Sequence, residues 1–316
     1  MRQIELSIII VNYNSSVDLR KCLFSIYKET QEINFEVIVI ENASTVGTID
    51  NVIKEFPEVI LIKNTTNKGF AAANNQGIAI ARGEFILLLN PDTIVLDRAI
   101  VKSIDFIRSN PQIGIVGCKL IFPDEKFQNS ARNFPSIRSL FSEAFFLDRF
   151  INLTHNGTIS KKNDWVMGAF FLVRKEVFDK IGLLDEQFFV YGEEMDFCYR
   201  AWESMYEVWY CSEAIVQHTW AGWNSPSCQS VVWSIGADLL FIDKHFKGVH
   251  RFLMKAIKLL GVTNRAIMYF LYGIVFRDKF YLHKAKYYYK ALLYSHLACW
   301  KYNQGVQGLV YPWPQV

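Results

Sequence analysis

Short apolar runs alternate with helical patterns over the first ninety residues. In the first helical pattern, apolar residues recur at i, i+3, i+4 and i+7 from Leu19, after a Ser15/Ser16 cap. A second such pattern begins at Ile49, after Ser44. The apolar runs lack the alternation of half-exposed strands, which is typical of parallel strands covered on both faces. These runs are residues 6–11, 35–41, 59–63 and 84–89.

Strands that alternate with helices predict right-handed βαβ units, and therefore an α/β fold with a doubly wound, mostly parallel sheet. In such sheets ligands bind at the carboxyl ends of the strands. The expected places are the polar segments that follow Val11, Ile40, residue 63 and Leu89. The clearest is "FILLLNPDTIVL", in which Pro91 interrupts an apolar run and Asp92 follows at once. A carboxylate at this place is a candidate for chemistry, and the alternative is a turn residue, because Pro-Asp is a common turn pair.

The second half of the chain is expected to supply another ligand surface and a helical tail. From about Ile113 the apolar runs lengthen, as in "IGIVGCKLIF" and "WVMGAFFLV", around a mixed stretch at 124–163. After Lys244 the sequence is helical, aromatic and basic, as in "KAKYYYKALLY". This composition suits a membrane interface, and the alternative is an ordinary helical subdomain that packs on the sheet.

Composition narrows the class of protein. The chain has 316 residues, ample for a large α/β domain with an appendage. Its 34 Lys+Arg and 31 Asp+Glu give a net charge of +3, which makes no case for a nucleic-acid partner. Six cysteines without a C-x-x-C pair argue against a zinc site or disulfide framework and favour the cytoplasm. The sequence contains no uncharged apolar stretch long enough to predict a membrane-spanning helix. The first apolar run is too short and too rich in β-branched residues for a signal peptide.

Six segments resemble, in chain order, the family 2 glycosyltransferases, and most closely the bacterial rhamnosyltransferase branch. They are "SIIIVNYNSSVDLRKCLFSI", "VIVIENASTVGT", "NKGFAAANNQGI", "GEFILLLNPDT", "WVMGAFFLVRKEVFDKIGLLDEQFFVYGEEMDFCYRA" and "QHTWAGWNS". The resemblance implies a glycosyltransferase A fold, a nucleotide-sugar donor, a divalent metal and inversion at the anomeric carbon. It covers residues 4 to about 250, so we expect a catalytic domain at 1–250, with a donor half at 1–112 and an acceptor half at 113–250, and a helical region at 251–316.

The resemblance assigns a metal site. Breaking the bond to a diphosphate develops negative charge that a divalent cation stabilises, and oxygen ligands suit Mg²⁺ or Mn²⁺. Asp92 is the expected carboxylate ligand, and Asn90 occupies the first place of the family's Asp-x-Asp, where it keeps a polar donor contact but brings no charge. His218 in "QHTWAGW" is the family-matching second ligand. The alternative for His218 is a packed or surface histidine.

The nucleobase of the sugar donor is expected to contact the residues that follow the first two strands. After the first strand these residues are Val11, Asn12, Tyr13 and Asn14. Glu41 stands where the family usually has an Asp that accepts from the base's ring N–H, and Asn42 follows it. The alternative is that Glu41 and Asn42 cap the next helix. Gly69 opens a small-residue helix, on which Asn74 is the chosen donor contact, and close packing of that helix on the sheet is the alternative.

The acceptor and the catalytic base are assigned to the second half. Trp165 and Gly168 resemble the family's acceptor floor, where an indole stacks on a sugar, and a core tryptophan is the alternative. In "YGEEMDFCYRA" the second acid, Glu194, aligns with the family's base, with Asp196 as the reserve candidate and Glu193 in support. Carboxylates at a helix start also stabilise the helix dipole, so capping or indirect support is the alternative.

The sequence therefore predicts an inverting, metal-dependent glycosyltransferase at the inner face of the cell membrane. We expect it to move rhamnose from a thymidine diphosphate donor to a saccharide or lipid-linked acceptor in cell-surface polysaccharide assembly. One alternative is a transferase for uridine diphosphate hexoses. A sugar nucleotidyltransferase would need a Gly- and Lys/Arg-rich loop where "VNYNSS" stands. A non-catalytic saccharide-binding protein would not need Asp92, Glu194 and His218.

Overall fold

The computed structural model describes residues 3–147, 157–219 and 229–303, with the backbone alone at 229 and 294–303. The chain forms two compact units. The sheet unit comprises Met1–Phe134, His155–Glu186 and Glu193–Trp220, and the helical unit comprises Pro135–Thr154, Gln187–Gly192 and Ala221–Val316.

The sheet unit contains a mixed sheet in the order β3-β2-β1-β4-β11-β6-β12-β5, with β7 paired to β6 and β9 to β12. Its strands are β1 (Leu6–Asn12), β2 (Phe35–Glu41), β3 (Ile60–Lys63), β4 (Phe85–Leu89), β5 (Thr93–Leu96), β6 (Ile113–Ile121), β7 (Phe127–Gln128), β9 (Lys161–Asn163), β11 (Phe170–Arg174) and β12 (Glu207–His218). The pair β8 (Ala131–Arg132) and β10 (Trp165–Val166) forms a second small sheet. The four predicted parallel strands β1 to β4 are confirmed.

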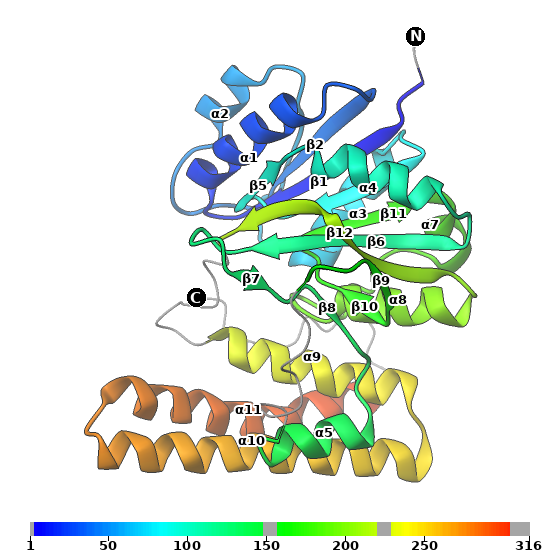
Figure 1. Ribbon diagram of the computed structural model, residues 1–316. Helices are drawn as coiled ribbons and strands as arrows, with labels where there is room; N and C mark the ends of the chain where they lie inside the picture. The colour runs from blue at the N-terminus through cyan, green and yellow to red at the C-terminus, as the bar shows by residue number, and fades with distance from the viewer. Residues whose placement is uncertain (1–2, 148–156, 220–228, 304–316) are drawn as a thin grey trace. The chain divides into compact units, whose positions relative to one another are not determined.

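Helices cover both faces of this sheet (Figure 1). They are α1 (Ser16–Glu29), α2 (Asp50–Glu55), α3 (Phe70–Ile80), α4 (Ala99–Arg108), α7 (Lys175–Ile181) and α8 (Glu193–Glu203). Alternate residues of β1 enter two separate cores: Ile8 packs with α1, α2 and α4, while Ile9 packs with α3, α7 and α8. Burial on both faces explains why the strand sequences are continuously apolar.

The ends of several strands meet at one edge of the sheet. The parallel pairing of β1 with β2 sets Asn12 opposite Glu41. The antiparallel strand β11 begins where β4 ends, with Phe170 opposite Leu89. At the far side, β12 ends where β5 begins, with His218 opposite Thr93. Polar residues from distant parts of the sequence are thereby brought to the same edge.

Three local predictions differ from the structure. The Ser15 hydroxyl donates to the carbonyl of Tyr13 (3.1 Å) and makes no cap for α1. Ser44 does not cap α2, whose N-cap residue is Ile49. The run "WVMGAFFLV" is two strands, β10 and β11, because the Met167 amide donates to the carbonyl of Ser130 and the Ala169 carbonyl accepts from the Asn90 amide.

The structure describes the side chains of four of the six cysteines. Cys22, Cys118, Cys198 and Cys211 are buried free thiols. Cys228 and the side chain of Cys299 lie outside the described part of the chain.

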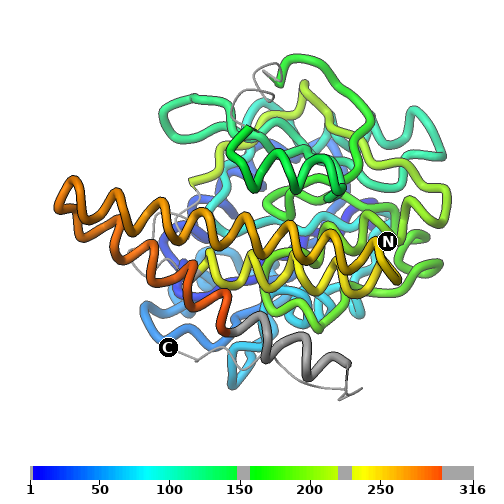
Figure 2. Tube along the Cα trace, turned by 90° about the horizontal axis from the view of Figure 1, so that it is seen from below, coloured from blue at the N-terminus to red at the C-terminus, as the bar shows by residue number. Residues whose placement is uncertain are grey.

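The helical unit contains α5 (Ile137–Ala144), α9 (Gln229–His245), α10 (Gly248–Val275) and α11 (Lys279–Asn303). Helices α10 and α11 run antiparallel, side by side (Figure 2). The Lys258 ammonium, almost fully buried, pairs with Asp238 of α9 (2.6 Å) and with Glu143 of α5 (3.3 Å). This buried charge therefore joins three helices of the unit.

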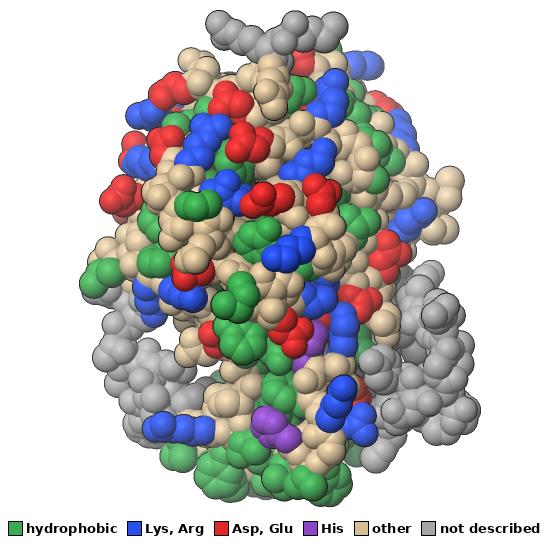
Figure 3. Space-filling view, turned by 90° about the vertical axis from the view of Figure 1, so that its right-hand side faces the viewer, with side chains coloured by type: hydrophobic (Ala, Val, Ile, Leu, Met, Phe, Trp, Pro, Cys, Tyr) green, Lys and Arg blue, Asp and Glu red, His purple; other side chains and the backbone are tan. Residues whose placement is uncertain are grey.

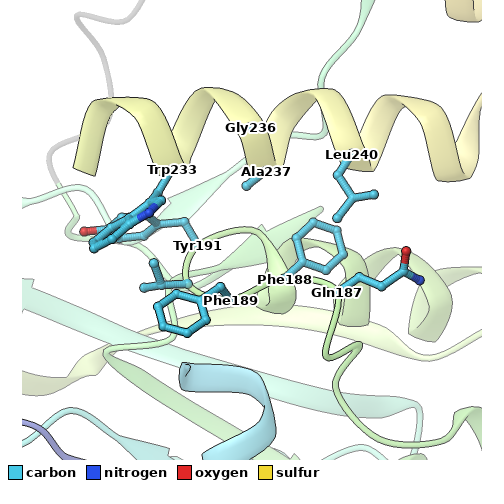
Figure 4. Close-up of a pocket in the computed structure, with 9 residues that line it drawn as sticks. Gln187, Phe188, Phe189, Tyr191, Trp233, Gly236, Ala237 and Leu240 are labelled. Carbon is cyan, nitrogen blue, oxygen red and sulfur yellow. The ribbon is translucent and has the colours of Figure 1, made fainter. Parts of the chain in front are cut away.

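The boundary expected at residue 250 differs from the division seen here, because it falls just inside α10. Val232 and Leu239 of α9 share a core with Val262 of α10 and Ala291 of α11. Within the same unit, the segment Gln187–Gly192 faces α9 across a small pocket lined by Phe188, Phe189, Tyr191, Trp233 and Leu240 (Figure 4). A contiguous boundary could not separate the units, since residues 135–154 and 187–192 belong with the C-terminal helices.

Candidate active site

All the residues expected to carry the chemistry lie in the sheet unit, and several of them lie where its strands end. The predicted metal ligands face each other there. The Nε2 atom of His218 lies 3.4 Å from Oδ1 of Asp92 and 3.4 Å from Nδ2 of Asn90. The side chains of His218 and Asp92 are only 3% and 14% exposed. The pairing of β12 with β5 brings these residues together across more than a hundred positions of sequence.

Gln128 fixes the orientation of the imidazole. Its Oε1 lies 2.9 Å from Nδ1 of His218, and Gln128 itself is buried on β7. When Nδ1 carries the imidazole proton and donates it to this oxygen, Nε2 is left unprotonated on the side of Asp92 and can bind a cation. Sequence reasoning missed Gln128, because a glutamine in a two-residue strand gives no signal until the register of β7 on β6 is known.

The Asp92–His218 pair fits a divalent cation. One carboxylate oxygen and one unprotonated imidazole nitrogen are ordinary ligands for Mn²⁺, and a phosphate-bound metal keeps phosphate and water oxygens for its other places. Within the described residues, no group of three or more His, Cys, Asp or Glu could enclose a metal ion.

Asn12 and Glu41 form a buried hydrogen-bonded pair at the ends of β1 and β2. The side-chain amide of Asn12 donates to Oε2 of Glu41 (2.6 Å). The other oxygen of this carboxylate, Oε1, accepts from the backbone N–H of Ser44 (2.8 Å). The Ser44 hydroxyl in turn accepts a hydrogen bond from the backbone N–H of Asn14 (2.9 Å). Glu41 therefore binds the loop that follows β2, and the alternative in which it caps α2 is wrong.

Asn42 connects this loop to the one that follows β3. Its amide donates to Oδ1 of Asn67 (2.8 Å), and its Oδ1 accepts from Asn64 (3.0 Å) and from the Lys68 amide (3.1 Å). Gly69 adopts a φ of +82°, which glycine tolerates without strain, and α3 begins directly after it. Asn42 is thus occupied by these loops and caps no helix. Asn64 and Asn67 are further residues of this network that sequence reasoning missed.

The other residues expected to bind the nucleotide-sugar donor differ in exposure. Tyr13 is 37% exposed, whereas Val11 is buried. Asn14, at a φ of +57°, accepts through Oδ1 from the amides of Thr45 and Val46. Asn74 is 1% exposed, and its amide donates to the Phe70 carbonyl within α3. Tyr13 is therefore the open ring surface beside the Asn12–Glu41 pair, while the position of Asn74 fits helix packing.

Glu194 is the partly exposed member of three carboxylates at the start of α8. Its Oε1 accepts a long hydrogen bond from the Gly168 amide (3.4 Å). Gly168 precedes Ala169, whose backbone carbonyl accepts a hydrogen bond from the backbone N–H of Asn90. Two backbone contacts, at Gly168 and Ala169, therefore connect Glu194 to Asn90, which lies two residues before Asp92.

The two neighbouring acids are buried. Burial and then the adjacent Glu194 carboxylate raise the pKa of Glu193 well above its usual range. Asp196 is fully buried and pairs with Arg200 (2.8 Å). The geometry therefore favours Glu194 over Asp196 as a group that meets substrate, and it gives Asp196 a structural partner.

A comparison with known protein families shows the family of the chain. The model described as "Glycosyl transferase family 2" matches residues 7–182, more than half of the chain. The chain belongs to glycosyl transferase family 2. The matched segment of this family 2 enzyme includes Asp92 and Gly168 and ends before Glu194 and His218.

Three curated relatives of the family 2 enzyme carry names of sugar transfer or of the biosynthesis of sugar polymers. The "Low-salt glycan biosynthesis hexosyltransferase Agl10" of Haloferax volcanii is 25% identical over 84% of this chain and 81% of the relative. The "N-acetylglucosaminyl-diphospho-decaprenol L-rhamnosyltransferase" of Mycobacterium tuberculosis is 26% identical over 60% of this chain and 68% of the relative. The "O-antigen biosynthesis protein RfbC" of Myxococcus xanthus is 30% identical over 60% of this chain, which spans only 15% of RfbC.

Solved structures confirm the predicted glycosyltransferase A fold. A mannosyltransferase from Pyrobaculum calidifontis, solved with GDP-Man and Mn²⁺, has a TM-score of 0.57 and 13% identity. The alignment covers 97% of this chain and 89% of that one. Among the described residues, no helix is long and apolar enough to cross a membrane.

The expected acceptor floor of the family 2 enzyme is only partly open. The indole N–H of Trp165 donates to the Asn133 carbonyl (3.1 Å), and the Arg132 guanidinium lies 5.6 Å over the ring. One ring face is therefore occupied by Arg132. A methyl group added at Gly168 would lie 3.8 Å from Oε1 of Glu194, at ordinary contact distance. Beyond His218 and Thr219, the "QHTWAGWNS" segment lies outside the described residues.

Removing the glutamine that faces His218 is expected to weaken metal binding. Gln128→Met fills similar space but leaves Nδ1 without its acceptor, so the imidazole loses its fixed tautomer. We expect a roughly tenfold loss of Mn²⁺ affinity, the lower end of the range for such partners of metal ligands. Titration of Mn²⁺ in the presence of a nucleoside diphosphate measures it. Gln128→Glu, which retains an acceptor, should restore most of the affinity, and equal affinities for Gln128→Met and the wild type would contradict the role.

Proposed function

We propose that this family 2 glycosyltransferase is an inverting, metal-dependent hexosyltransferase that uses a thymidine diphosphate rhamnose donor. Its acceptor is a saccharide or a lipid-linked saccharide in cell-surface polysaccharide assembly. The observation that carries the proposal is the Asp92–His218 pair at the same sheet edge as the partly exposed Glu194. The printed names of the mycobacterial rhamnosyltransferase and of Agl10 support the sugar class and the glycan pathway.

Asp92 and His218 would hold a divalent cation, Mg²⁺ or Mn²⁺. Such an ion, when bound, neutralises charge that develops on the leaving diphosphate. Asn90, 3.4 Å from the imidazole, remains a hydrogen-bond donor for the sugar or ribose of the donor. Tyr13 offers its ring to the base beside the Asn12–Glu41 pair, which keeps the ends of β1 and β2 in register.

Glu194 acts as the general base. As the acceptor oxygen forms its bond to the anomeric carbon on one face, the bond from that carbon to the diphosphate oxygen breaks on the other. The hydroxyl proton passes to a carboxylate oxygen of Glu194. Burial, and then the neighbouring Glu194 carboxylate, raise the pKa of Glu193 and so favour its protonated form, which leaves Glu194 as the more accessible carboxylate of the two. The Gly168 amide orients the carboxylate.

A thermal-shift panel of nucleotide sugars tests the donor. With Mn²⁺ present, thymidine diphosphate rhamnose at a hundred times its dissociation constant is expected to stabilise the protein by about 2.7 kcal/mol. Uridine diphosphate hexoses should stabilise it less, and omission of Mn²⁺ should remove most of the effect. A larger shift with a uridine diphosphate hexose would replace the proposed donor by that alternative. Absence of any metal-dependent shift would contradict the proposal as a whole.

A further inference from the structure

Helix α10 of the helical unit carries an apolar stripe on its exposed side. Leu253, Leu260, Ile267 and Ile274 recur every seven residues, which places them nearly in line along the helix. Their exposed fractions are 41%, 43%, 54% and 54%. Phe252 and Phe270 flank this line and are 70% and 53% exposed. We call these six residues the apolar stripe. In Figure 3 hydrophobic side chains gather over the helical unit at the lower edge of the view.

The stripe is unusual for an ordinary surface helix, because the buried side of α10 holds a charge while large apolar groups face outwards. Lys258 is buried in its ion pairs with α5 and α9, whereas Phe252 is exposed. Single exposed apolar residues need no explanation, but a contiguous row of them marks an interaction surface. At 1.5 Å per residue, the row from Phe252 to Ile274 extends over about 33 Å of this helix.

The charges around the stripe are almost all positive. From Gly248 to Asn303 the sequence has ten basic residues and one acidic residue, Asp278. On α10, Arg251, Lys255, Lys258 and Arg265 pair with acids of α5 and α9. For the cations of the turn and α11, no ion pair is found within the described part of the chain. These are Arg277, Lys279, Lys284, Lys286 and Lys290, while the side chain of the tenth basic residue, Lys301, lies outside the described part of the chain.

Helix α11 mixes apolar and basic side chains on its exposed side. Leu282, Lys286 and Tyr289 are exposed at helical spacing. The Lys284 ammonium lies 4.8 Å over the ring of Tyr269, and Tyr269 stacks on Tyr281. Aromatic rings and long basic side chains with apolar stems are the residues that settle at the headgroup level of a bilayer.

We propose that the apolar stripe of α10, with the unpaired cations of α11 and the turn, docks on the surface of an anionic lipid bilayer. The helix lies in the plane of the interface with the six side chains among the acyl chains and headgroups. The cations meet the negative surface potential of the lipids. A docked protein would have access to a lipid-linked acceptor, although the proposal does not depend on the transfer reaction.

A second copy of the chain fits this surface less well. If two stripes faced each other, the unpaired cations of one copy would lie near those of the other and repel them. In each copy, Asp278 is the only acidic residue of α10, α11 and their connection that could offset this repulsion. The exposed apolar set is also wider than a coiled-coil seam, since Leu271 and Val275 extend it to one side. The surface of an anionic bilayer complements the positive charge of these cations and is broad enough to cover the whole exposed apolar set.

Flotation of the full-length protein with lipid vesicles tests the docking. We expect binding to vesicles of phosphatidylcholine with phosphatidylglycerol, weaker binding at high salt, and little binding to phosphatidylcholine alone. Phe252→Asp and Phe270→Asp should each lower the vesicle partition coefficient roughly tenfold or more. Phe24→Asp is the matched control, because Phe24 is 67% exposed on α1 of the sheet unit. It should bind as the wild type does.

A charge series separates the electrostatic part. Lys286→Glu and Lys290→Glu should each lower partition into the anionic vesicles roughly fivefold or more, while Lys54→Glu on α2 should not. Circular dichroism and donor-induced thermal shift verify that each variant is folded and binds donor. Three results would overturn the docking: stripe variants that bind like the wild type, equal binding to both kinds of vesicle, or a wild-type dimer that Phe252→Asp converts to a monomer.

Discussion

Replacement of Glu194 by glutamine is expected to lower the turnover number by roughly 10²–10⁴-fold, the range for loss of a general base. An amide cannot take the proton of the acceptor hydroxyl, yet it has the size of the carboxylate and can still accept from the Gly168 amide. Donor and metal affinity should therefore be nearly unchanged. Steady-state kinetics with the donor from the thermal-shift panel, together with calorimetric titration of that donor, gives both quantities.

The matched control is Glu203→Gln, at the exposed end of the same helix, which should turn over normally. Asp196→Asn provides the discriminating comparison. It weakens a buried ion pair with Arg200, so its expected effect is on stability, measured by urea unfolding, more than on turnover of the folded fraction. Normal turnover of Glu194→Gln together with inactive, folded Asp196→Asn would move the base two positions along α8.

The second large effect is expected from Asp92→Ala. This variant removes the carboxylate oxygen that faces Nε2 of His218, and with it the negative charge that attracts a cation. Because a bound metal supplies several kcal/mol of charge stabilisation at the leaving group, we expect kcat/KM to fall by roughly 10²-fold or more at limiting Mn²⁺. High Mn²⁺ should recover part of the loss, since His218 and the donor phosphates remain.

Asp105→Ala, which removes an exposed carboxylate on α4, serves as the control and should leave the Mn²⁺ dependence unchanged. His218→Ala should give the same pattern of loss as Asp92→Ala. Combining the two substitutions should add little to either one, because each disables the same pair. Full activity of Asp92→Ala at limiting Mn²⁺ would exclude Asp92 as a ligand.

The sheet and its ligand edge were predictable because they depend on local patterns. Continuous apolar runs revealed strands buried on both faces, and polar residues at their ends, such as Asn12 and Asp92, marked the edge. Helix α8 was expected at "GEEMD" for the same reason. These features depend on residues adjacent in the sequence, so they are visible without coordinates.

What the sequence concealed depends on contacts between distant segments. Gln128 meets His218 only through the register of β7, β6 and β12. Ser44 looked like a helix cap, but its hydroxyl accepts from Asn14 across the strand ends. The different burial of Glu193, Glu194 and Asp196 follows from how α8 packs. The division into units was likewise hidden, because Gln187–Gly192 belongs with helices that begin some forty residues later.

The pairing of β12 with β5 has an evolutionary consequence. It holds His218 opposite Thr93, one residue from Asp92, whatever the length of the chain that connects the two strands. Insertions, losses or exchange of loops in that interval would leave the two proposed metal ligands in place. Descendants of such a chain could therefore acquire new acceptors by altering the connecting loops, while the two proposed metal ligands and the segments that carry Gln128 and Glu194 are inherited unchanged.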